Sequence, residues 1–367
     1  SSACYTTGTT GKPKGVYYSH RDVYLQAMMY ALNAMISVKD CVFQIVPMFH
    51  VLGWGTPYAA ALTGAKLVFP GRYSLEDLDE LVKILVQEKT TLSSGVPSIL
   101  RAMLEPLLKM DPRPDLSGVR FLCGGSEPPL SMMKSYWDAT RAEIIHTYGS
   151  TEAQAIVTLN LSKPWLNRDL SEEEKWELKK KQGFVVVGLD AKIVDSSGKE
   201  LPHDGESVGE ILLRGPWVLG KYHDAPGSET QFTEDGYFRT GDVGAIDSEG
   251  YLKLSDRLKD LIKSGGEWIS SVDMENEIVN HPAVLEGAVV GVAHAKWEER
   301  PLALVVLRDE FKTKVHKNEI LEHLGKRFAK WQLPDEVLFV EAIPKTSVGK
   351  IDKKVIRANH RDVYASR

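Results

Sequence analysis

The segment YTTGTTGKPKG, Tyr5 to Gly15, lies almost at the first residue of the chain. Its glycines let the backbone turn tightly and approach a ligand closely. Its hydroxyls, amide N–H groups and two lysines offer hydrogen bonds and positive charge to phosphate oxygens. The common P-loop is excluded, because that pattern continues Gly-Lys with Ser or Thr, whereas Gly11 and Lys12 are followed by Pro13. The segment therefore predicts a nucleotide phosphate site of another kind.

The bulk composition is that of an ordinary globular protein. The 367 residues are 43% hydrophobic and 26% charged, with a net charge of −5 at pH 7. The length favours two or three domains, and the lack of a basic excess argues against a nucleic-acid partner. Cys4, Cys41 and Cys123 show no metal-ligand spacing, which favours a reducing compartment, so we expect a cytoplasmic protein. No apolar run reaches the ~18 residues of a membrane helix, so we expect no transmembrane segment.

Strand and helix patterns alternate between residues 21 and 148. The predicted helices are 22–36 with Ser19 as cap, 75–89, and 96–108 with a break or kink at Pro106; the predicted strands are 41–46, 65–69, 119–125 and 143–149. This alternation predicts an α/β fold with a parallel sheet covered by helices. Ligands bind such sheets at the carboxyl ends of strands, which directs attention to Gly124, Gly125 and Ser126, and to Tyr148 and Gly149.

The pattern changes in the second half of the chain. Residues 171–181 are typical of a charged helix on the surface. Turn signals separate short strands from 184 to 255, which predicts an antiparallel, barrel-like subdomain. A small α+β unit follows from about residue 260. Its predicted helices are 272–280 and 317–329, and its predicted strands lie near 284–293 and 302–307.

Five short motifs occur in one order along nearly the whole chain, although each is a weak signal alone. They are the opening segment, YGSTE at 148–152, YFRTGD at 237–242, DRLKDLIKSGGE at 256–267 and PKTSVGKIDK at 344–353. Together they resemble the adenylate-forming superfamily of acyl-CoA synthetases, luciferases and peptide-synthetase adenylation domains. This resemblance implies activation of a carboxylate by ATP to an acyl adenylate.

Further stretches are similar to the bacterial medium- and long-chain fatty-acyl-CoA synthetases. They are VPMFHVLGW at 46–54, LSEEEKWELKKKQG at 170–183, GPWVLGKYH at 215–223 and SGGEWISSVDMENEI at 264–278. The resemblance implies an N-terminal adenylation domain at 1–258 and a mobile C-terminal domain at 259–367, with a hinge near Lys259. The family also carries a substantial segment before the opening motif, so we expect a partial N-terminal domain.

The resemblance assigns roles in catalysis and phosphate binding. Lys350 resembles the catalytic lysine, whose ammonium can bridge the fatty carboxylate and the α-phosphate. Glu152 resembles the Mg²⁺ ligand, a hard oxygen donor suited to that ion, and Thr151 resembles the α-phosphate contact. The β,γ-phosphate clamp would consist of Thr6, Thr7, Gly8, Thr9, Thr10, Gly11 and Lys14.

Other residues would bind the nucleoside, the acyl chain and the pantetheine arm. Asp242 resembles the acceptor of both ribose hydroxyls, and Arg257 a second ribose contact, with a surface salt bridge as the alternative. The adenine site would comprise Tyr148, stacked on the base, with Gly124, Gly125, Ser126, Glu127 and Gly149. The acyl and CoA channel would comprise His50, Trp54, Gly124, Gly265, Gly266 and Glu267, with core packing as the alternative for His50 and Trp54.

The sequence thus predicts a fatty acid–CoA ligase that uses ATP, Mg²⁺ and CoA. Its partners would be small molecules, and a homodimer is compatible with the sequence. Two alternatives stay open: an inactive truncated remnant that binds a partner protein, and an adenylating enzyme that feeds a carrier protein. Intact motifs favour an enzyme over a remnant. The pantetheine segment does not separate CoA from a carrier arm, because both present the same thiol.

Overall fold

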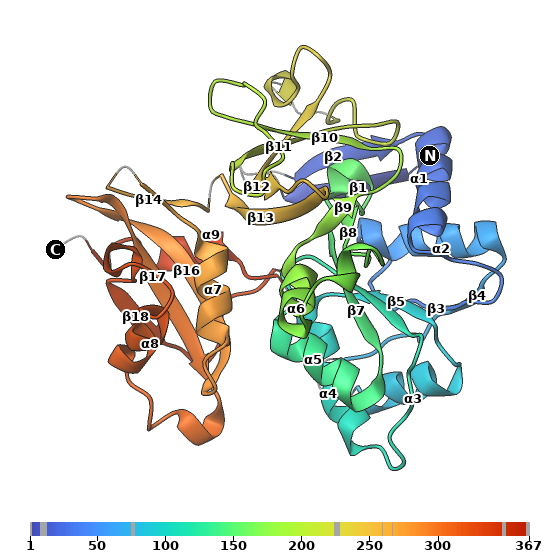
Figure 1. Ribbon diagram of the computed structural model, residues 1–367, viewed down its shortest axis with the longest axis horizontal. Helices are drawn as coiled ribbons and strands as arrows, with labels where there is room; N and C mark the ends of the chain where they lie inside the picture. Colours follow the sequence, from blue (N-terminus) through green and yellow to red (C-terminus); the bar gives the residue numbers. More distant parts are fainter. Residues whose placement is uncertain are drawn as a thin grey trace. The chain divides into compact units, whose positions relative to one another are not determined.

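The computed structural model describes residues 2–7, 13–74, 78–223, 228–258, 260–265, 267–346 and 350–364 (Figure 1). At positions 7, 52, 54, 167, 228 and 229 it describes the backbone alone. The chain divides into two compact units. The first unit comprises residues 1–240 and 244–254, and the second comprises residues 241–243 and 255–367.

Strands alternate with helices up to residue 148, as the sequence predicts, and mainly strands follow up to residue 257. The elements are β1 (Ser2–Thr7), β2 (Pro13–Tyr18), α1 (His20–Asn33), β3 (Cys41–Phe43), α2 (Val51–Thr63), β4 (Lys66–Val68), α3 (Asp79–Gln87), β5 (Leu92–Gly95), α4 (Pro97–Lys109), β6 (Arg120–Cys123), α5 (Leu130–Thr140), β7 (Glu143–Tyr148), the 3₁₀ turn η1 (Thr151–Ala153), β8 (Thr158–Leu159), η2 (Leu166–Arg168), α6 (Glu172–Lys180), β9 (Gly183–Val185), β10 (Asp190–Val194), β11 (Gly209–Arg214), η3 (Ser228–Gln231), β12 (Phe238–Ile246) and β13 (Tyr251–Arg257).

Eleven strands form one sheet in the order β10-β11-β12-β13-β9-β8-β7-β6-β5-β3-β4. The strands from β3 to β7 pair in parallel. Alternate strand residues face opposite sides, as strand geometry requires. Val42 and Leu122 pack in the cluster that includes Tyr30 of α1. Their neighbours Phe43 and Phe121 pack in the cluster that includes residues of α3, α4 and α5, so helices cover both faces.

Strand β7 is the place where the parallel part of the sheet becomes antiparallel. It pairs in parallel with β6 and antiparallel with β8, which pairs in turn with β9. The strands between 184 and 255 are antiparallel, as expected, in the pairs β10–β11 and β13–β9. Their hydrogen-bond ladder continues directly from the parallel strands, a continuity that the sequence did not indicate.

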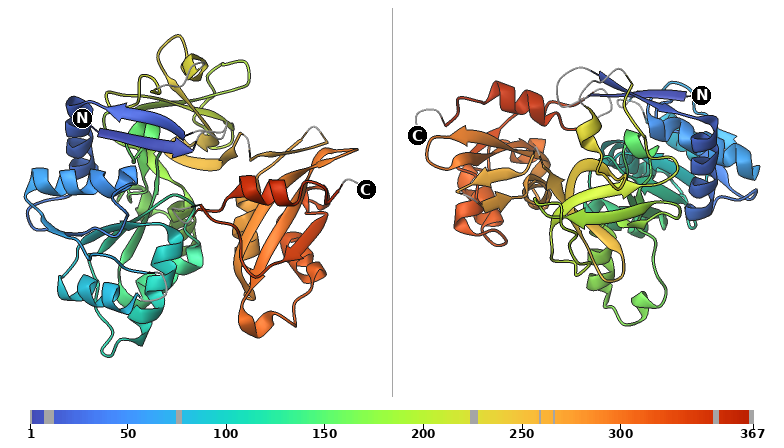
Figure 2. Two further views of the ribbon diagram at one scale, coloured as in Figure 1. Left: turned by 180° about the vertical axis from the view of Figure 1, so that it is seen from behind. Right: turned by 90° about the horizontal axis from the view of Figure 1, so that it is seen from above.

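The opening motif lies in a hairpin outside the large sheet. Strands β1 and β2 pair antiparallel in register from Ser2 opposite Tyr18 to Thr7 opposite Pro13, drawn in blue in Figure 2. The hairpin is held to the rest of the unit by the bridge between Gly15 and His223 and by a stack of the Tyr17 and His223 rings at 4.3 Å. The sequence predicted only a loop here.

Helix boundaries differ from the predictions where side-chain contacts decide them. The Ser19 cap is confirmed, because its side chain accepts from the Asp22 N–H in a capping box, and α1 begins at His20. Of the expected break or kink at Pro106, the break is wrong: α4 continues to Lys109, and Leu107 is fully buried against the sheet. The kink stays a prediction. Helix α8 stops at Leu324 and not at 329, and Gly325, a residue that disfavours helix, follows its last residue.

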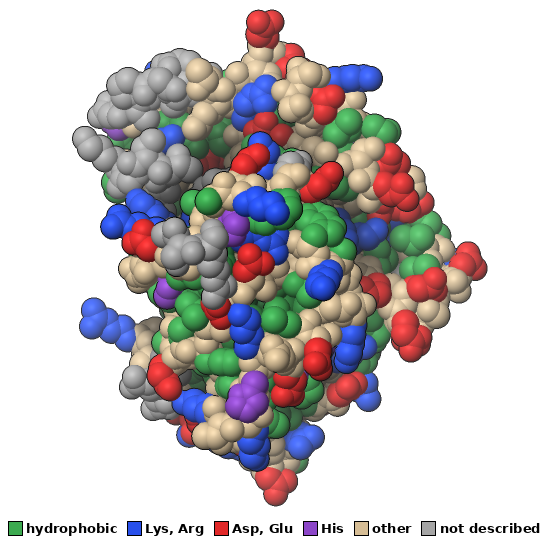
Figure 3. Space-filling view, turned by 90° about the vertical axis from the view of Figure 1, so that its left-hand side faces the viewer, with side chains coloured by type: hydrophobic (Ala, Val, Ile, Leu, Met, Phe, Trp, Pro, Cys, Tyr) green, Lys and Arg blue, Asp and Glu red, His purple; other side chains and the backbone are tan. Residues whose placement is uncertain are grey.

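The second unit is a smaller α+β layer structure. Its elements are β14 (Ile262–Ser264), β15 (Glu267–Ile269), α7 (Ser271–Val279), β16 (Val284–His294), β17 (Glu298–Leu307), η4 (Asp309–Phe311), α8 (Lys317–Leu324), η5 (Lys330–Gln332), β18 (Glu336–Phe339) and α9 (Lys353–Asn359). Val289 faces a core shared with α7 and α8, while Val290 faces a core shared with Ile356 of α9. On the surface shown in Figure 3, basic and acidic side chains are interspersed.

The three cysteines are free and buried. Burial raises the pKa of the Cys4, Cys41 and Cys123 thiols above the usual value, most strongly for Cys123. Among the helices in the described part of the chain, none is both long and apolar enough to cross a membrane.

His146 on β7 is a buried titratable group beside the parallel-to-antiparallel transition. It is 3% exposed, and its ring Nδ1 lies 2.8 Å from the Lys180 carbonyl oxygen. Burial lowers the pKa of His146 from 6.5 to about 4, although the hydrogen bond to Lys180 opposes the shift. Between pH 6.5 and about 4, His146 is therefore protonated in the unfolded state but neutral in the folded state. The free energy of unfolding falls as the pH drops through this window.

We expect His146→Gln to flatten this pH dependence, because glutamine can donate to the Lys180 carbonyl but does not titrate. Between pH 7 and pH 5, the free energy of unfolding of the wild type should fall by about 2 kcal/mol more than that of the variant. Urea unfolding at both pH values measures the difference. Exposed His203 supplies the control, and His203→Gln should leave the wild-type pH dependence unchanged. If the free energy of unfolding of His146→Gln and of the wild type fell equally between pH 7 and pH 5, the lowered pKa of His146 would be contradicted.

Candidate active site

The turn after β7 places Thr151 and Glu152 at the carboxyl end of the strand. A Cβ at Gly149 would lie 1.4 Å from the Ala155 carbonyl oxygen, so only glycine fits. The turn closes through hydrogen bonds from the Ala155 N–H to Ser150 and from the Val157 N–H to Tyr148. Because the backbone doubles back here, the 3₁₀ turn presents Thr151 and Glu152 beside the end of the sheet.

Glu152 is joined to the opening hairpin through Tyr222. The Tyr222 hydroxyl donates to Glu152 Oε1 at 2.7 Å, and Lys14 Nζ lies 4.9 Å from the centroid of the Tyr222 ring. Burial, with the neighbouring Glu152 charge, raises the pKa of Tyr222 above its usual value and keeps the phenol protonated as a donor. The structure thus brings together Lys14 and Glu152, predicted to contact phosphate and metal.

Thr151 is held by the same hairpin. The hydroxyl of Tyr18, which is buried on β2, donates to the Thr151 carbonyl oxygen. Burial raises the pKa of Tyr18 well above its usual value, so this donor also stays protonated. The Thr6 side chain is half-buried on the facing strand β1. Of the predicted phosphate clamp, residues 8–12 and the side chain of Thr7 lie outside the described residues.

The residues predicted to surround adenine follow the neighbouring strand β6. A Cβ at Gly124 would lie 2.8 Å from the Thr147 carbonyl oxygen, so the end of β6 fits closely against the end of β7. Gly125 has a φ of +87°, a conformation that favours glycine, and it turns the chain so that Ser126 is exposed and Glu127 half-buried. These residues therefore lie beside the Tyr148–Glu152 turn.

Tyr148 is more deeply buried than a stacking platform requires. It is 8% exposed and packs in a cluster with Val157, Ile193 and Leu252. Much of the ring thus contributes to the core, and its stacking on adenine stays a prediction.

His50 lies in the tight turn that leads into α2. Its N–H donates to the Pro47 carbonyl at 3.0 Å, and its carbonyl accepts from the Gly53 N–H at 2.7 Å. The turn borders the opening hairpin, because Cys4 Sγ donates to the Phe49 carbonyl at 3.8 Å. The Trp54 side chain lies outside the described atoms, so its predicted place at an acyl channel is untested.

The predicted ribose residues form an ion pair. Asp242 Oδ1 lies 3.2 Å from Arg257 Nε, with the Asp242 side chain 10% exposed and the Arg257 side chain 56% exposed. The Leu258 N–H donates to the Gly241 carbonyl at 2.9 Å, which holds the two segments side by side. The arginine therefore contacts the carboxylate that the ribose is predicted to use.

The residues predicted for the pantetheine channel and the hinge lie in the second unit. Gly265 has a φ of +63°, and its N–H donates to the Trp297 carbonyl at 3.0 Å. Glu267 is exposed at the start of β15. Lys259 and Gly266 lie outside the described residues.

Lys350 is bonded to Thr346 in the second unit, and the described residues 344–346 and 350–352 are called the Lys350 turn below. Its carbonyl accepts from the Thr346 N–H at 2.7 Å, and its own N–H lies 3.2 Å from Thr346 Oγ1. A β-bridge between Lys345 and Ile351 encloses this turn. Lys350, Asp242 and Arg257 thus belong to the second unit, and Glu152 and Lys14 to the first.

The donor set fits a metal that binds together with a nucleotide. In the described parts of the chain, no three His, Cys, Asp or Glu side chains gather into a metal cluster. Mg²⁺ commonly takes one or two protein carboxylates and completes its shell with water and substrate phosphates. Glu152, beside Lys14, supplies one such carboxylate and fits this mode of binding.

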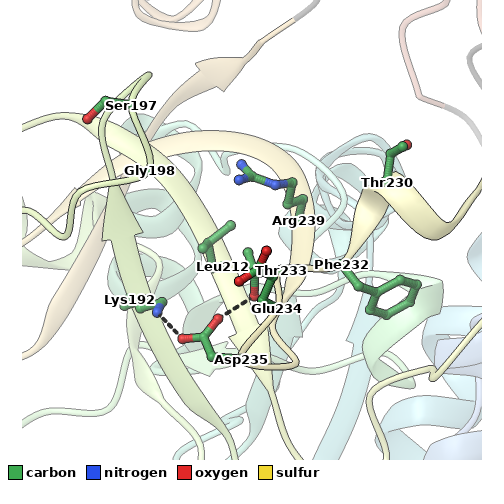
Figure 4. Close-up of a pocket in the computed structure, with 10 residues that line it drawn as sticks. All are labelled: Lys192, Ser197, Gly198, Leu212, Thr230, Phe232, Thr233, Glu234, Asp235 and Arg239. Atoms are coloured by element: carbon green, nitrogen blue, oxygen red, sulfur yellow. Dashed lines mark hydrogen bonds and ion pairs between the residues drawn. The ribbon is translucent and has the colours of Figure 1, made fainter.

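A separate hollow of about 590 Å³ lies among β10, β11, β12 and the 230–235 segment (Figure 4). Both of its basic groups are paired: Lys192 Nζ lies 2.6 Å from Asp235 Oδ2, and Arg239 Nη1 lies 2.6 Å from Glu210 Oε2. Hydrogen bonds from Lys192 and Thr233 lower the pKa of Asp235 to about 2. The predicted site residues do not line this hollow.

Comparison with known proteins identifies the family. Residues 2–223 match the family described as AMP-binding enzyme, and residues 273–350 match the AMP-binding enzyme C-terminal domain. The chain belongs to this family, which confirms the resemblance to adenylate-forming enzymes and the predicted fold class.

Individual relatives are similar over nearly the whole chain. The chain is 45% identical to a long-chain-fatty-acid–CoA ligase of Thermus thermophilus over 98% of its residues, and 41% identical to a medium-chain-fatty-acid–CoA ligase of Ectopseudomonas oleovorans over 99%. It spans only 66% and 65% of the lengths of these relatives. Among solved structures, o-succinylbenzoate CoA synthetase of Bacillus subtilis with the acyl-adenylate OSB-AMP superposes with a TM-score of 0.81. That match is 28% identical and covers 97% of this chain and 68% of the other.

Tyr222 is the site residue that the sequence reasoning missed. The stretch GPWVLGKYH, which contains Tyr222, indicates only a family resemblance, because the partner Glu152 lies 70 residues away in the sequence.

We expect Tyr222→Phe to lower the free energy of unfolding by about 2 kcal/mol, since it removes a hydrogen bond to a carboxylate in a buried setting. Urea unfolding measures this loss.

Tyr237→Phe is the matched control. The Tyr237 hydroxyl also donates to a carboxylate, Asp190 at 2.5 Å, but the Asp190 side chain is 55% exposed. Water can replace the lost donor there, so the loss should stay below about 1 kcal/mol. Equal losses in the two variants would show that Glu152 does not depend on Tyr222.

Proposed function

We propose that the protein is an AMP-forming acid–thiol ligase that activates a fatty acid with ATP and transfers the acyl group to CoA. The observation that carries the proposal is the cluster of Lys14, Tyr222 and Glu152 at the end of β7. Through Tyr222 this cluster holds a cation and a carboxylate in one part of the unit, which suits a metal–phosphate complex. The names of the two CoA ligase relatives support the choice of acid and thiol.

In the first half-reaction, the fatty carboxylate attacks the α-phosphorus of ATP and releases pyrophosphate. Both reactants are anions, so a cation between them lowers the barrier. We assign this cation to Lys350. Lys14 would bind the outer phosphates with the hydroxyls of the opening motif. Glu152 would hold Mg²⁺, which when bound neutralises phosphate charge.

The nucleoside would be held by the Asp242–Arg257 pair and by the loops after β6 and β7. Asp242 can accept hydrogen bonds from both ribose hydroxyls, because a carboxylate offers two acceptor oxygens, and the Arg257 cation lies 3.2 Å from one of them. Thr151 would contact the α-phosphate.

In the second half-reaction, the CoA thiol displaces AMP from the acyl adenylate. We propose that the 259–367 domain turns about Lys259 between the two steps. Lys350 would then withdraw, and residues 265–267 would border the path of the pantetheine arm. A domain that turns lets one site serve two reactions with different geometry.

We further propose that the reaction takes place in the cytoplasm. The support is that all three cysteines are free, as is usual where glutathione keeps thiols reduced. ATP, Mg²⁺ and CoA would be the small-molecule partners there.

Replacement of Lys350 tests the assignment of the catalytic cation. In the natural full-length protein, Lys350→Ala should reduce fatty-acid-dependent ATP–pyrophosphate exchange by about 10²–10³-fold, the effect of losing one preorganised donor at a developing charge. Thioester formation from preformed acyl adenylate and CoA should persist. Exposed Lys354 gives the control, and Lys354→Ala should exchange at the wild-type rate. Exchange near wild type in Lys350→Ala would refute the assignment.

The acid series from acetate to palmitate tests the substrate class. If the acyl chain enters an apolar channel, each added methylene should contribute about 0.8 kcal/mol, close to fourfold in kcat/KM, until the channel ends. Specificity should therefore rise steadily to an optimum and then level or fall. Trp54→Ala should weaken discrimination among long acids more than it slows acetate. A maximum at acetate, or preference for an aromatic or amino acid, would overturn the fatty-acid assignment and leave adenylation intact.

A further inference from the structure

A buried ion pair lies three residues beyond Lys350. Lys353 begins α9, and its Nζ lies 2.9 Å from Glu275 Oε1 and donates to Ser271 Oγ at 2.6 Å. The two charged side chains are 12% and 13% exposed. Glu275 is held in turn, because it accepts from the Val289 N–H at 2.8 Å. A buried pair with these directional bonds specifies one position for the start of α9.

The same network reaches the predicted ribose residues. Asp256 Oδ2 accepts from the N–H of Ser271 at 2.7 Å and from its hydroxyl. Asp256 Oδ1 accepts from the Arg257 N–H at 2.7 Å. Arg257 pairs with Asp242. A continuous chain of hydrogen bonds and backbone therefore runs from Lys353 to the Asp242–Arg257 pair, within the second unit.

Helix α9 has a second polar anchor one turn later. Arg357 donates to Asp260 Oδ1 at 2.7 Å. Ile356, between the two basic residues, is fully buried in the core under β16 and β17. Lys353 thus docks α9 on Glu275 of α7, and Arg357 docks it on Asp260, which follows the predicted hinge residue in the sequence.

The turn that carries Lys350 is continuous with this helix. The Asp352 N–H donates to the Pro344 carbonyl at 2.8 Å, and Ile351 forms a β-bridge with Lys345. Both ends of the turn are therefore closed immediately before α9 begins. Wherever the start of α9 is fixed, the position from which Lys350 emerges is fixed with it.

We propose that Lys353 is a positioning residue for Lys350: its salt bridge to Glu275 and hydrogen bond to Ser271 fix the Lys350 turn relative to the Asp242–Arg257 pair. The inference rests on the proposed function, in which Lys350 acts in adenylation. Burial alone would lower the pKa of Lys353, but the Glu275, Asp256 and Asp260 carboxylates outweigh it and raise the pKa, so the group stays charged. Misplacement of a reacting group by about 1 Å can cost about 10²-fold in rate.

The experiment compares three variants of the natural full-length protein in the two half-reactions. Lys353→Met should reduce ATP–pyrophosphate exchange by at least about tenfold. Its rate of thioester formation from preformed acyl adenylate should change by less than about twofold, because Lys350 does not act in that step. Lys353→Arg should recover most of the exchange, since a guanidinium can meet the same carboxylate. Lys354→Met, at the adjacent exposed lysine, is the matched control and should behave as wild type.

Testing Lys353→Met in the Lys350→Ala variant shows whether Lys353 acts by positioning Lys350 or through a general loss of structure. In Lys350→Ala, the further change Lys353→Met should alter the residual exchange by less than about twofold, because residues that act as one unit are not additive. An unchanged exchange rate in Lys353→Met, an equal loss in both half-reactions, or an additive loss in Lys350→Ala would each overturn the proposal. If Lys353→Met does not fold, Lys353→Met combined with Glu275→Met removes the unpaired charge and permits the same measurements.

Different results refute the proposed function and the role of Lys353. If no acid in the series supports ATP–pyrophosphate exchange by the wild-type protein, the proposed function is wrong, and the role of Lys353 is wrong with it. If the wild type exchanges and Lys350→Ala does not, while Lys353→Met exchanges as wild type, only the inference about Lys353 fails.

Discussion

The approach of Gly149 to the Ala155 carbonyl is the constraint on which the candidate site depends. No side chain fits there, so the chain can double back directly after β7. β7 is also the strand at which parallel pairing gives way to antiparallel pairing. The close turn therefore stands at the junction of two kinds of sheet and at the carboxyl end of a strand, where α/β sheets commonly bind ligands. The orientation of Thr151 and Glu152 follows from the backbone before any side chain contributes.

Polar partners then fix the candidate side chains without neutralising the site. Glu152 receives a phenol hydrogen bond from Tyr222, which holds the carboxylate and leaves its charge in place. Asp242 faces Arg257, a cation that is more than half exposed and can follow a ligand. By contrast, the hollow near β10 pairs its lysine and its arginine with carboxylates and keeps no excess charge for an anionic substrate. Glu152 thus has a neutral hydrogen-bond partner, whereas the lysine and the arginine of the hollow are paired with carboxylates.

The sequence predicted those features that local chemistry controls. Alternating patterns located most strands within a few residues, and Ser19 was identified as a cap because its partner is three residues away. Pro106 was misjudged, because burial of Leu107 offsets a local preference that the sequence alone shows. Tyr222 and Lys353 were missed for a related reason: their partners lie 70 and 82 residues away. The motif residues could be named from the family pattern, but the contacts that orient them arise only on folding.

The burial of all three cysteines has a practical consequence for an enzyme whose proposed cosubstrate is a thiol. Raised thiol pKa values keep Cys4, Cys41 and Cys123 in the unreactive protonated form, so they compete poorly as acyl acceptors or alkylation targets. A cysteine introduced on the surface would be the thiol that reacts with a label. Within residues 1–367, new surface cysteines would therefore be the positions at which fluorophores attach.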